Sequence, residues 1–148
     1  MTTDEPLRAR KKAMDLLARR EHSRKELSAK LLTRGFSAGT VDNVLTVLAD
    51  EDLLSEKRFA EAFIAARSRR GKGPIRLRAE LRQRGLADSV IEDALADSAI
   101  DWLDIARRVL IKKFGDAAPS ELQERARQTR FLEYRGFDAG LIRAALDC

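Results

Sequence analysis

The amino-acid sequence predicts an all-α protein made of tandem three-helix repeats. Leu, Ala and Arg dominate its 148 residues, and these residue types favour helices. Val and Ile are scattered singly, and no alternating apolar and polar stretch of strand length occurs. A pattern centred on glycine returns about every fifty residues. We therefore expect three repeats, covering about 7–53, 54–99 and 100–148, in an elongated and curved molecule.

Three glycines mark equivalent positions in the repeats: Gly35, Gly85 and Gly136. Each follows an Arg and precedes a large apolar residue, with Leu four residues before it and Val or Ile six residues after it. This spacing places apolar residues on one face of a helix on either side of the glycine. The glycine supplies the left-handed residue that ends the first of the two helices. We call the turn around it a glycine corner.

A longer helix is expected upstream of each corner, so that each repeat holds three helices. The expected ranges are 7–20, 56–70 and 101–113, and Ser55 caps the second of them. The segment 114–120 contains a glycine and a proline, which predicts a longer loop in the third repeat. A unit of this size buries only a small core, so we expect packing between neighbouring repeats to add stability.

Capping residues mark the starts of the shorter helices. Ser23 and Glu26 have the spacing of a capping box. Gly73 takes the place of Ser23 in the second repeat, and Pro74 follows at the first helical position, where its missing N–H costs nothing. Further caps are expected at Ser37, at Asp138 and at the capping box of Ser89 with Glu92.

Charge is distributed unevenly along the chain, although 29 basic and 24 acidic residues leave a net charge of only +5. Segments 7–34 and 58–84 are mostly basic, whereas 37–57 and 85–106 are mostly acidic. The first two helices of a repeat are thus basic and the third is acidic, and we expect the two signs to occupy opposite surfaces. A basic stripe on an extended body suits a polyanion such as nucleic acid. The alternative is an ordinary solvated helical face.

The basic side chains of these stretches are candidate contacts with a polyanion. The helix start at 73–74 also carries backbone N–H groups, which we expect to face a phosphate. One Trp and one Tyr form no aromatic platform for bases, so the expected contacts are with phosphates and ignore base sequence. The candidates are Arg19, Arg20, Arg24, Lys25, Arg67, Arg69, Arg70, Lys72, Arg76, Arg78, Arg108, Lys112 and Lys113.

The other chemistry-bearing residues favour structural roles over catalysis. With one His (His22) and one Cys (Cys148), the chain lacks the material for a Cys/His zinc cluster. We expect His22 to be exposed beside the cap at Ser23, and Cys148 to be an uninvolved thiol. Glu92 and Asp93 point about 100° apart on a helix, which makes a weak metal pair. We therefore expect no enzymatic activity, no metal and no other cofactor.

The remaining features concern the third repeat and the cellular setting. Trp102, Phe131 and Tyr134 are expected in the core of the third repeat or at its end surface. No apolar run approaches the ~18 residues of a membrane span, and the first ten residues are too polar for a secretory signal. We expect a cytoplasmic protein in a reducing compartment, present as a monomer.

Four stretches follow one another in an order that resembles a known family: 18–27, 58–63, 73–81 and 130–137. They are similar to the motifs of the RecX family, the bacterial regulators of the RecA recombinase. The resemblance covers about 9–146, and its motifs are specific as an ordered set. Lys72 departs from it slightly, at a position where an aromatic residue is expected as often as a base.

The resemblance implies a non-enzymatic modulator of RecA, built from tandem three-helix repeats. Members of the family bind the RecA filament on single-stranded DNA and lie in its helical groove. They inhibit ATP hydrolysis, strand exchange and co-protease activity, and so regulate recombination, DNA repair and the SOS response. Two other functions remain open from the residues: a sequence-nonspecific DNA-binding helical protein that acts through its basic stripe, and a metal-dependent nuclease.

Overall fold

The computed structural model describes residues 4–147, which form nine helices and no strand. In chain order the helices are α1 (Asp4–Arg19), α2 (Arg24–Thr33), α3 (Ala38–Asp50), α4 (Glu56–Arg69), α5 (Pro74–Gln83), α6 (Asp88–Asp97), α7 (Trp102–Phe114), α8 (Leu122–Arg135) and α9 (Ala139–Leu146). The all-α prediction is therefore confirmed. The expectations for Cys148 and for the first three residues of the chain lie outside the described residues.

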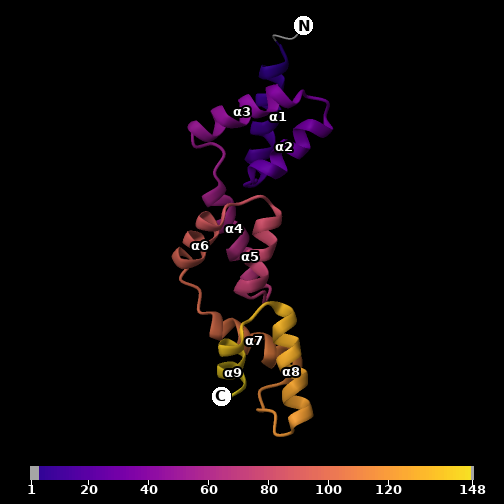
Figure 1. Cartoon of the computed structure of the whole chain (residues 1–148), viewed down its shortest axis with the longest axis vertical. Coiled ribbons are helices and arrows are strands. Elements are labelled where there is room, and N and C mark those ends of the chain that lie inside the picture. The colour runs from indigo at the N-terminus through magenta and orange to yellow at the C-terminus, as the bar shows by residue number, and fades with distance from the viewer. Residues whose placement is uncertain (1–3, 148) are drawn as a thin grey trace.

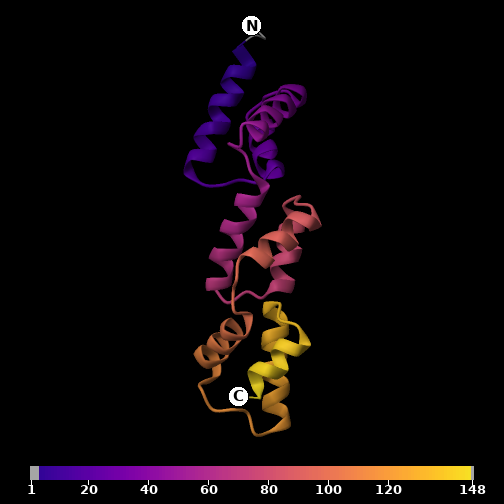
Figure 2. The ribbon, with the colours of Figure 1, turned by 90° about the vertical axis from the view of Figure 1, so that its left-hand side faces the viewer.

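Three stacked units give the molecule an elongated, gently curved shape (Figures 1 and 2). Helices α1–α3 form unit 1, α4–α6 form unit 2 and α7–α9 form unit 3. In Figure 1 the second helix of each unit lies on one side of the stack and the third helix on the other. No described helix has both the length and the apolar character needed to cross a membrane.

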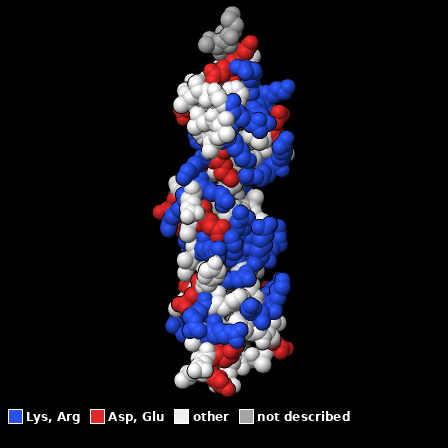
Figure 3. All heavy atoms as spheres, turned by 90° about the vertical axis from the view of Figure 1, so that its right-hand side faces the viewer, with Lys and Arg blue, Asp and Glu red and all other residues white. Residues whose placement is uncertain are grey.

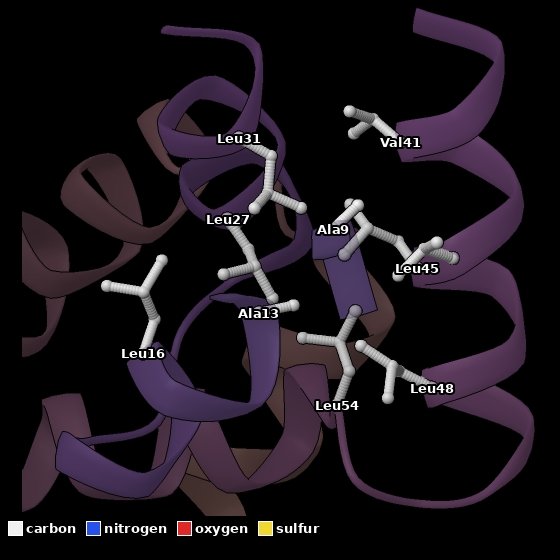
Figure 4. Close-up of a cluster of buried hydrophobic side chains, with 10 residues drawn as sticks. Ala9, Ala13, Leu16, Leu27, Leu31, Val41, Leu45, Leu48 and Leu54 are labelled. Atoms are coloured by element: carbon white, nitrogen blue, oxygen red, sulfur yellow. The ribbon is translucent and has the colours of Figure 1, made fainter. Parts of the chain in front are cut away.

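Each unit has a small hydrophobic core of its own. In Figure 4 side chains from the three helices of unit 1 converge with Leu54 of the linker to α4: Ala9, Ala13, Leu16, Leu27, Leu31, Val41, Leu45, Leu48 and Leu54. Units 2 and 3 bury the equivalent repeat positions, and each large side chain contributes about 1.5–3 kcal/mol. Among the described residues, Trp102 is the one side chain that packs against two cores. Apolar packing between units is thus smaller than the sequence led us to expect.

The glycine corners have the predicted left-handed backbone, with φ of +92° at Gly35, +88° at Gly85 and +97° at Gly136. A side chain is strained in this conformation. Two corners also abut the preceding unit. A Cβ at Gly136 would lie 2.5 Å from the Cβ of Arg76, and one at Gly85 would lie 3.0 Å from the Cβ of Lys25. Gly35 belongs to the first unit, and the described residues place no atom within 4 Å of its missing Cβ.

Most predicted helix starts are confirmed. Ser23 Oγ accepts from the Glu26 N–H at 3.1 Å, and Glu26 Oε1 accepts from the Ser23 N–H at 3.2 Å, so both halves of the capping box are present. Ser55 and Asp138 accept backbone N–H groups at the starts of α4 and α9. These bonds satisfy N–H groups that have no partner inside the helix.

One predicted cap is wrong, and another has the predicted position without the capping hydrogen bond. Ser37 occupies the N-cap position of α3, but its hydroxyl bonds the Thr40 hydroxyl at 3.0 Å and caps no backbone N–H. Helix α6 begins at Asp88, so Ser89 lies inside it and forms no capping box with Glu92. The chain enters this helix as soon as it leaves the glycine corner, which places the start earlier than the Ser-Glu spacing suggests.

Unit 3 departs from the repeat where the sequence predicted a longer loop. The connection between α7 and α8 spans 115–121, whereas 20–23 joins α1 to α2. Gln128 takes the buried position that Leu27 and Leu77 hold in the other units. Its side-chain amide nitrogen donates to Glu124 Oε1 at 3.3 Å, so the polar replacement has a hydrogen-bond partner.

Candidate functional site

The two junctions between units are built in the same way, with the second helix of one unit resting on the glycine corner of the next. At the second junction, between units 2 and 3, the Gly73 N–H donates to Arg135 O at 2.7 Å. The Ile75 N–H donates to Gly136 O at 3.0 Å. These donors face unit 3, so the predicted phosphate site at the start of α5 is wrong.

Beside the second junction, cationic side chains from units 2 and 3 surround a hollow of about 370 Å³. Val109 of α7 and Phe131 of α8 form its apolar wall, and no carboxylate among the described residues lines it. We call this feature the basic hollow. Its cationic residues are Arg69, Arg70, Arg108, Lys112, Lys113 and Arg135.

The ends of three helices explain why so many cations are tolerated here. Helices α4, α7 and α8 all finish at the hollow with basic residues in their last turns. The C-terminal end of a helix carries partial negative charge, which favours a nearby cation by about 0.3–1 kcal/mol. Within the described part of the chain, Arg108 is the one member of the hollow with an ion pair, to Asp104 at 2.9 Å.

Arg135 joins the hollow although it was not among the sequence-predicted candidates. Its guanidinium donates to Arg70 O at 3.0 Å and lies 5.1 Å from the ring centre of Phe131. It is the Arg of the third glycine corner, equivalent to Arg34 and Arg84. This repeat position was visible in the sequence, but only the packing of the units shows that the side chain faces the preceding unit.

A second group of candidates shares one carboxylate inside unit 2. Arg67 and Arg76 each lie 3.3 Å from a carboxylate oxygen of Glu80. Lys72 Nζ lies 3.2 Å from each of the two oxygens of the same carboxylate. Burial would raise the pKa of Glu80, but the hydrogen bond and charge of Lys72, with the two arginines, outweigh it and lower that pKa. These three cations therefore hold α4 and α5 together as well as contributing to surface charge.

Two other candidates pair with acids of the third helix in their own unit. Arg78 on α5 lies 2.7 Å from a carboxylate oxygen of Glu92 on α6. Arg24 on α2 lies 2.8 Å from Asp42 on α3. Both pairs are partly exposed, where an ion pair contributes about 0–1 kcal/mol. Their positive charge is largely compensated locally.

The remaining candidates lie around the first junction, between units 1 and 2, away from the basic hollow. Arg20 lies 3.3 Å from Glu26, and Lys25 Nζ donates to Gln83 O at 3.0 Å. Arg19 is exposed at the end of α1. The structure therefore divides the predicted stripe into the basic hollow, which no described carboxylate lines, and cations elsewhere that mostly pair with acids in their own unit.

Charge also differs between the sides of the stack. Figure 3 shows Lys and Arg spread over one face of all three units, most densely in the middle unit. Helices α3 and α6 contain acidic residues but no Lys or Arg, and they lie opposite α2 and α5 (Figure 1). Helix α9 carries Arg143, so unit 3 does not repeat this acidic side.

His22 is buried, with 1% of its surface exposed, and the prediction that it is exposed is wrong. The loop before α2 turns the ring inward, where Nδ1 lies 3.1 Å from Arg20 O and Nε2 lies 2.8 Å from Lys30 Nζ. Because Lys30 can only donate, Nε2 accepts and Nδ1 carries the proton. Burial lowers the pKa of His22, which keeps the ring neutral.

The remaining singled-out residues divide between core and surface. Trp102 and Phe131 pack against the core of unit 3, whereas Tyr134 is exposed, with Arg76 of unit 2 lying 5.2 Å from its ring centre. Glu92 and Asp93 are exposed. Across residues 4–147, no group of three or more His, Cys, Asp or Glu side chains could hold a metal ion.

Fold and surface together define the class of this protein: an all-helical tandem-repeat protein with a concentrated cationic surface. Family models for the first, second and third three-helix domains of RecX match residues 9–48, 55–95 and 99–146. The chain belongs to the RecX family, as the sequence motifs predicted.

Relatives and solved structures agree with this assignment. The regulatory protein RecX of Halorhodospira halophila is 52% identical over 133 residues, which cover 90% of this chain and 83% of the relative. The regulatory protein RecX of Ectopseudomonas mendocina is 50% identical over 139 residues, or 94% and 93% of the two chains. The crystal structure of RecX from Lactobacillus salivarius has the same fold, with a TM-score of 0.84, 21% identity and coverage of 98% of this chain and 96% of that one.

Proposed function

We propose that this protein is a non-enzymatic, monomeric and cytoplasmic modulator of the RecA recombinase. It binds the RecA filament on single-stranded DNA and lies along the filament groove. It inhibits ATP hydrolysis, strand exchange and co-protease activity, and thereby regulates recombination, DNA repair and the SOS response. Membership of the RecX family supports RecA as the partner.

The observation that carries this proposal is an elongated body with cations concentrated between two of its units. The first helix of each unit has 13 to 16 residues and is therefore about 20–24 Å long. Three such units in a row can touch several subunits of a filament, and simultaneous contacts raise the overall affinity. Cations along the body contact DNA phosphates or acidic surface of the filament.

Inhibition follows if the protein prefers one conformation of the filament. A ligand shifts a conformational equilibrium only by the difference between its affinities for the two states. A rigid body that spans neighbouring subunits binds best where their spacing matches its own. ATP hydrolysis and strand exchange require the filament to change conformation, so such a body slows both.

The test is a titration of this protein into RecA hydrolysing ATP on single-stranded DNA, at two salt concentrations. We expect the hydrolysis rate to fall as the protein is added, and the inhibition to weaken at the higher salt concentration because ionic contacts are screened. An unchanged hydrolysis rate at saturating protein would contradict the proposal.

A second candidate function is sequence-nonspecific DNA binding, with effects on RecA following from it. The basic hollow favours this candidate, because it concentrates cations without a lining carboxylate among the described residues. Affinities for naked single-stranded DNA and for the RecA filament on the same DNA distinguish the two. Comparable affinities would support the second candidate, whereas a much higher affinity for the filament supports the first.

A further inference from the structure

The two junctions contain equivalent hollows. The hollow at the first junction has a volume of about 340 Å³, and the basic hollow at the second has about 370 Å³. Arg20 and Arg84 line the first, and their repeat equivalents Arg70 and Arg135 line the second. In both, the first helix of the later unit forms one wall. A direct comparison of their charges is therefore possible.

The arginines of the first hollow pair with carboxylates, and Arg67, which also lines it, pairs with Glu80. Glu26 lies 3.3 Å from Arg20 and 3.7 Å from Arg84, so one side chain links the two units. Burial would raise the pKa of Glu26, but hydrogen bonds from Arg20 and from the Ser23 N–H lower it. Glu26 is therefore ionised at neutral pH. Glu21 also lines this hollow and adds a second negative charge.

The basic hollow lacks equivalents of both acids. The repeat position of Glu21 is Gly71 in unit 2, and the position of Glu26 is Arg76. Arg76 is engaged by Glu80 and does not line the hollow. Among the described residues no carboxylate lines the basic hollow, and Asp104, which pairs with Arg108 at 2.9 Å, is not part of its lining.

The basic hollow has also gained cations. When α4 and α7 are aligned from their N-cap residues, Ala62 and Ala66 correspond to Arg108 and Lys112. The two alanines line the first hollow and the two cations line the second. Two neutral positions have thus become positive at the junction where the acids are missing. This combination leaves a clustered charge that an external anion can compensate.

We propose that the basic hollow binds adjacent phosphates of a single-stranded nucleic acid, which there replace the missing carboxylates. Guanidinium groups bind phosphate through paired hydrogen bonds, and a nucleic-acid strand presents one charge per nucleotide at regular spacing. Val109 and Phe131 offer apolar contact to the sugars between the phosphates. Because the cations come from units 2 and 3, a bound strand also braces the second junction. The choice of nucleic acid as partner rests on the proposed function.

The test measures binding of a fluorescent oligo(dT) to the full chain in the absence of RecA. The double variant Arg108→Ala/Lys112→Ala installs the residues of the first hollow at the equivalent positions of the second. We expect it to weaken binding about tenfold, and to lower the slope of log affinity against log salt by about 1.4, since each single-strand phosphate contact contributes about 0.7. Both side chains are exposed on α7, so the variant should keep its helical content.

The matched control is Arg82→Ala/Arg127→Ala, which removes the same charge from exposed helical positions outside the hollow. Arg82 and Arg127 each have an acidic partner, as Arg108 does. We expect the control to change the affinity less than twofold. Equal weakening by both double variants would mean that net charge alone drives binding, and would overturn the assignment of the hollow. Poly-glutamate and unlabelled oligo(dT) are then compared as competitors at equal concentrations of negative charge. If poly-glutamate displaces the labelled oligo(dT) more effectively, the hollow is a site for an acidic peptide and the proposal is overturned.

The same variants in the RecA assay separate this inference from the proposed function. Loss of oligo(dT) binding by Arg108→Ala/Lys112→Ala supports the hollow, whether or not inhibition of RecA also changes. If the unsubstituted chain binds oligo(dT) through the hollow but leaves RecA hydrolysis unchanged, the proposed function fails and the hollow stands. If the unsubstituted chain inhibits RecA and the double variant binds oligo(dT) unchanged, the hollow fails alone.

Discussion

At the corners Gly85 and Gly136, one residue meets two separate requirements. The left-handed φ favours glycine for local steric reasons. The close approach of the preceding unit adds a tertiary reason: Arg76 occupies the space that a Cβ at Gly136 would need, and Lys25 leaves only a tight contact for one at Gly85. Gly35 meets the first requirement only. The three corners look alike in sequence, but only Gly85 and Gly136 also make room for a side chain of the preceding unit.

Alanine substitutions separate these two requirements. We expect Gly136→Ala to lower the free energy of unfolding by about 2–4 kcal/mol, since strain of about 1–2 kcal/mol adds to displacement of Arg76. Gly35→Ala carries the strain without the displacement and should cost about 1–2 kcal/mol. Denaturant unfolding measures both values. Equal losses would mean that the close approach of Arg76 to Gly136 adds no cost beyond the backbone strain.

His22 makes stability depend on pH near neutrality. Its pKa is lowered by burial, so the unfolded chain takes up a proton at a higher pH than the folded chain does. The stability that neutral His22 contributes is complete above about pH 6.5 and declines as pH falls toward the lower folded pKa.

We expect the midpoint of urea unfolding to decrease between about pH 7.5 and about pH 5.5. Because the chain contains one His, His22→Gln should remove most of this dependence while keeping an acceptor for Lys30. An identical decrease in the variant would assign the dependence to carboxylates instead.

At the scale of helices, Glu80 ties α4 to α5 through three cations. Removing its charge leaves these cations facing one another at a partly buried site. We expect Glu80→Gln to lower the free energy of unfolding by about 1–2 kcal/mol, since hydrogen bonds to charged groups are stronger than neutral ones. Glu92→Gln breaks a more exposed pair with Arg78 and should cost less than about 1 kcal/mol. Thermal unfolding of the two variants at low salt makes the comparison.

The helices were predictable because glycine spacing and apolar periodicity are local signals. The start of α6 was misplaced because the Ser-Glu spacing of a capping box also occurs inside a helix. The basic hollow was predictable only in part. Charge runs selected Arg69 and Lys112, but the rotation of each helix about its axis decides which cations meet. That rotation places Arg135 in the lining of the basic hollow and directs Arg67 toward Glu80, with which it forms an ion pair.

At the scale of the whole molecule, separate cores make the shape depend on the junctions. The second junction is held by backbone hydrogen bonds from α5 to the corner of unit 3. The first depends on side chains, with Glu56 accepting from the Arg24 N–H and Arg58 lying 3.1 Å from Glu21. Ion pairs weaken in salt, whereas backbone hydrogen bonds do so much less. The orientation of unit 1 is therefore the more adjustable of the two.

Arg58 tests this difference, because it contacts Glu21 of unit 1 and also donates to the carbonyl of Asp52 at 2.6 Å. Asp52 has a left-handed φ of 61° in the linker, a conformation that this contact helps to hold. We expect Arg58→Ala to widen the distribution of molecular dimensions in small-angle X-ray scattering while leaving the three cores folded.

If several units contact a filament at once, looser coupling lowers their effective concentration and weakens inhibition of RecA by several-fold. Arg82→Ala, which removes an exposed arginine from within unit 2, should change neither measurement. Unchanged dimensions for Arg58→Ala would show that other contacts fix unit 1, and inhibition would then not depend on this arginine.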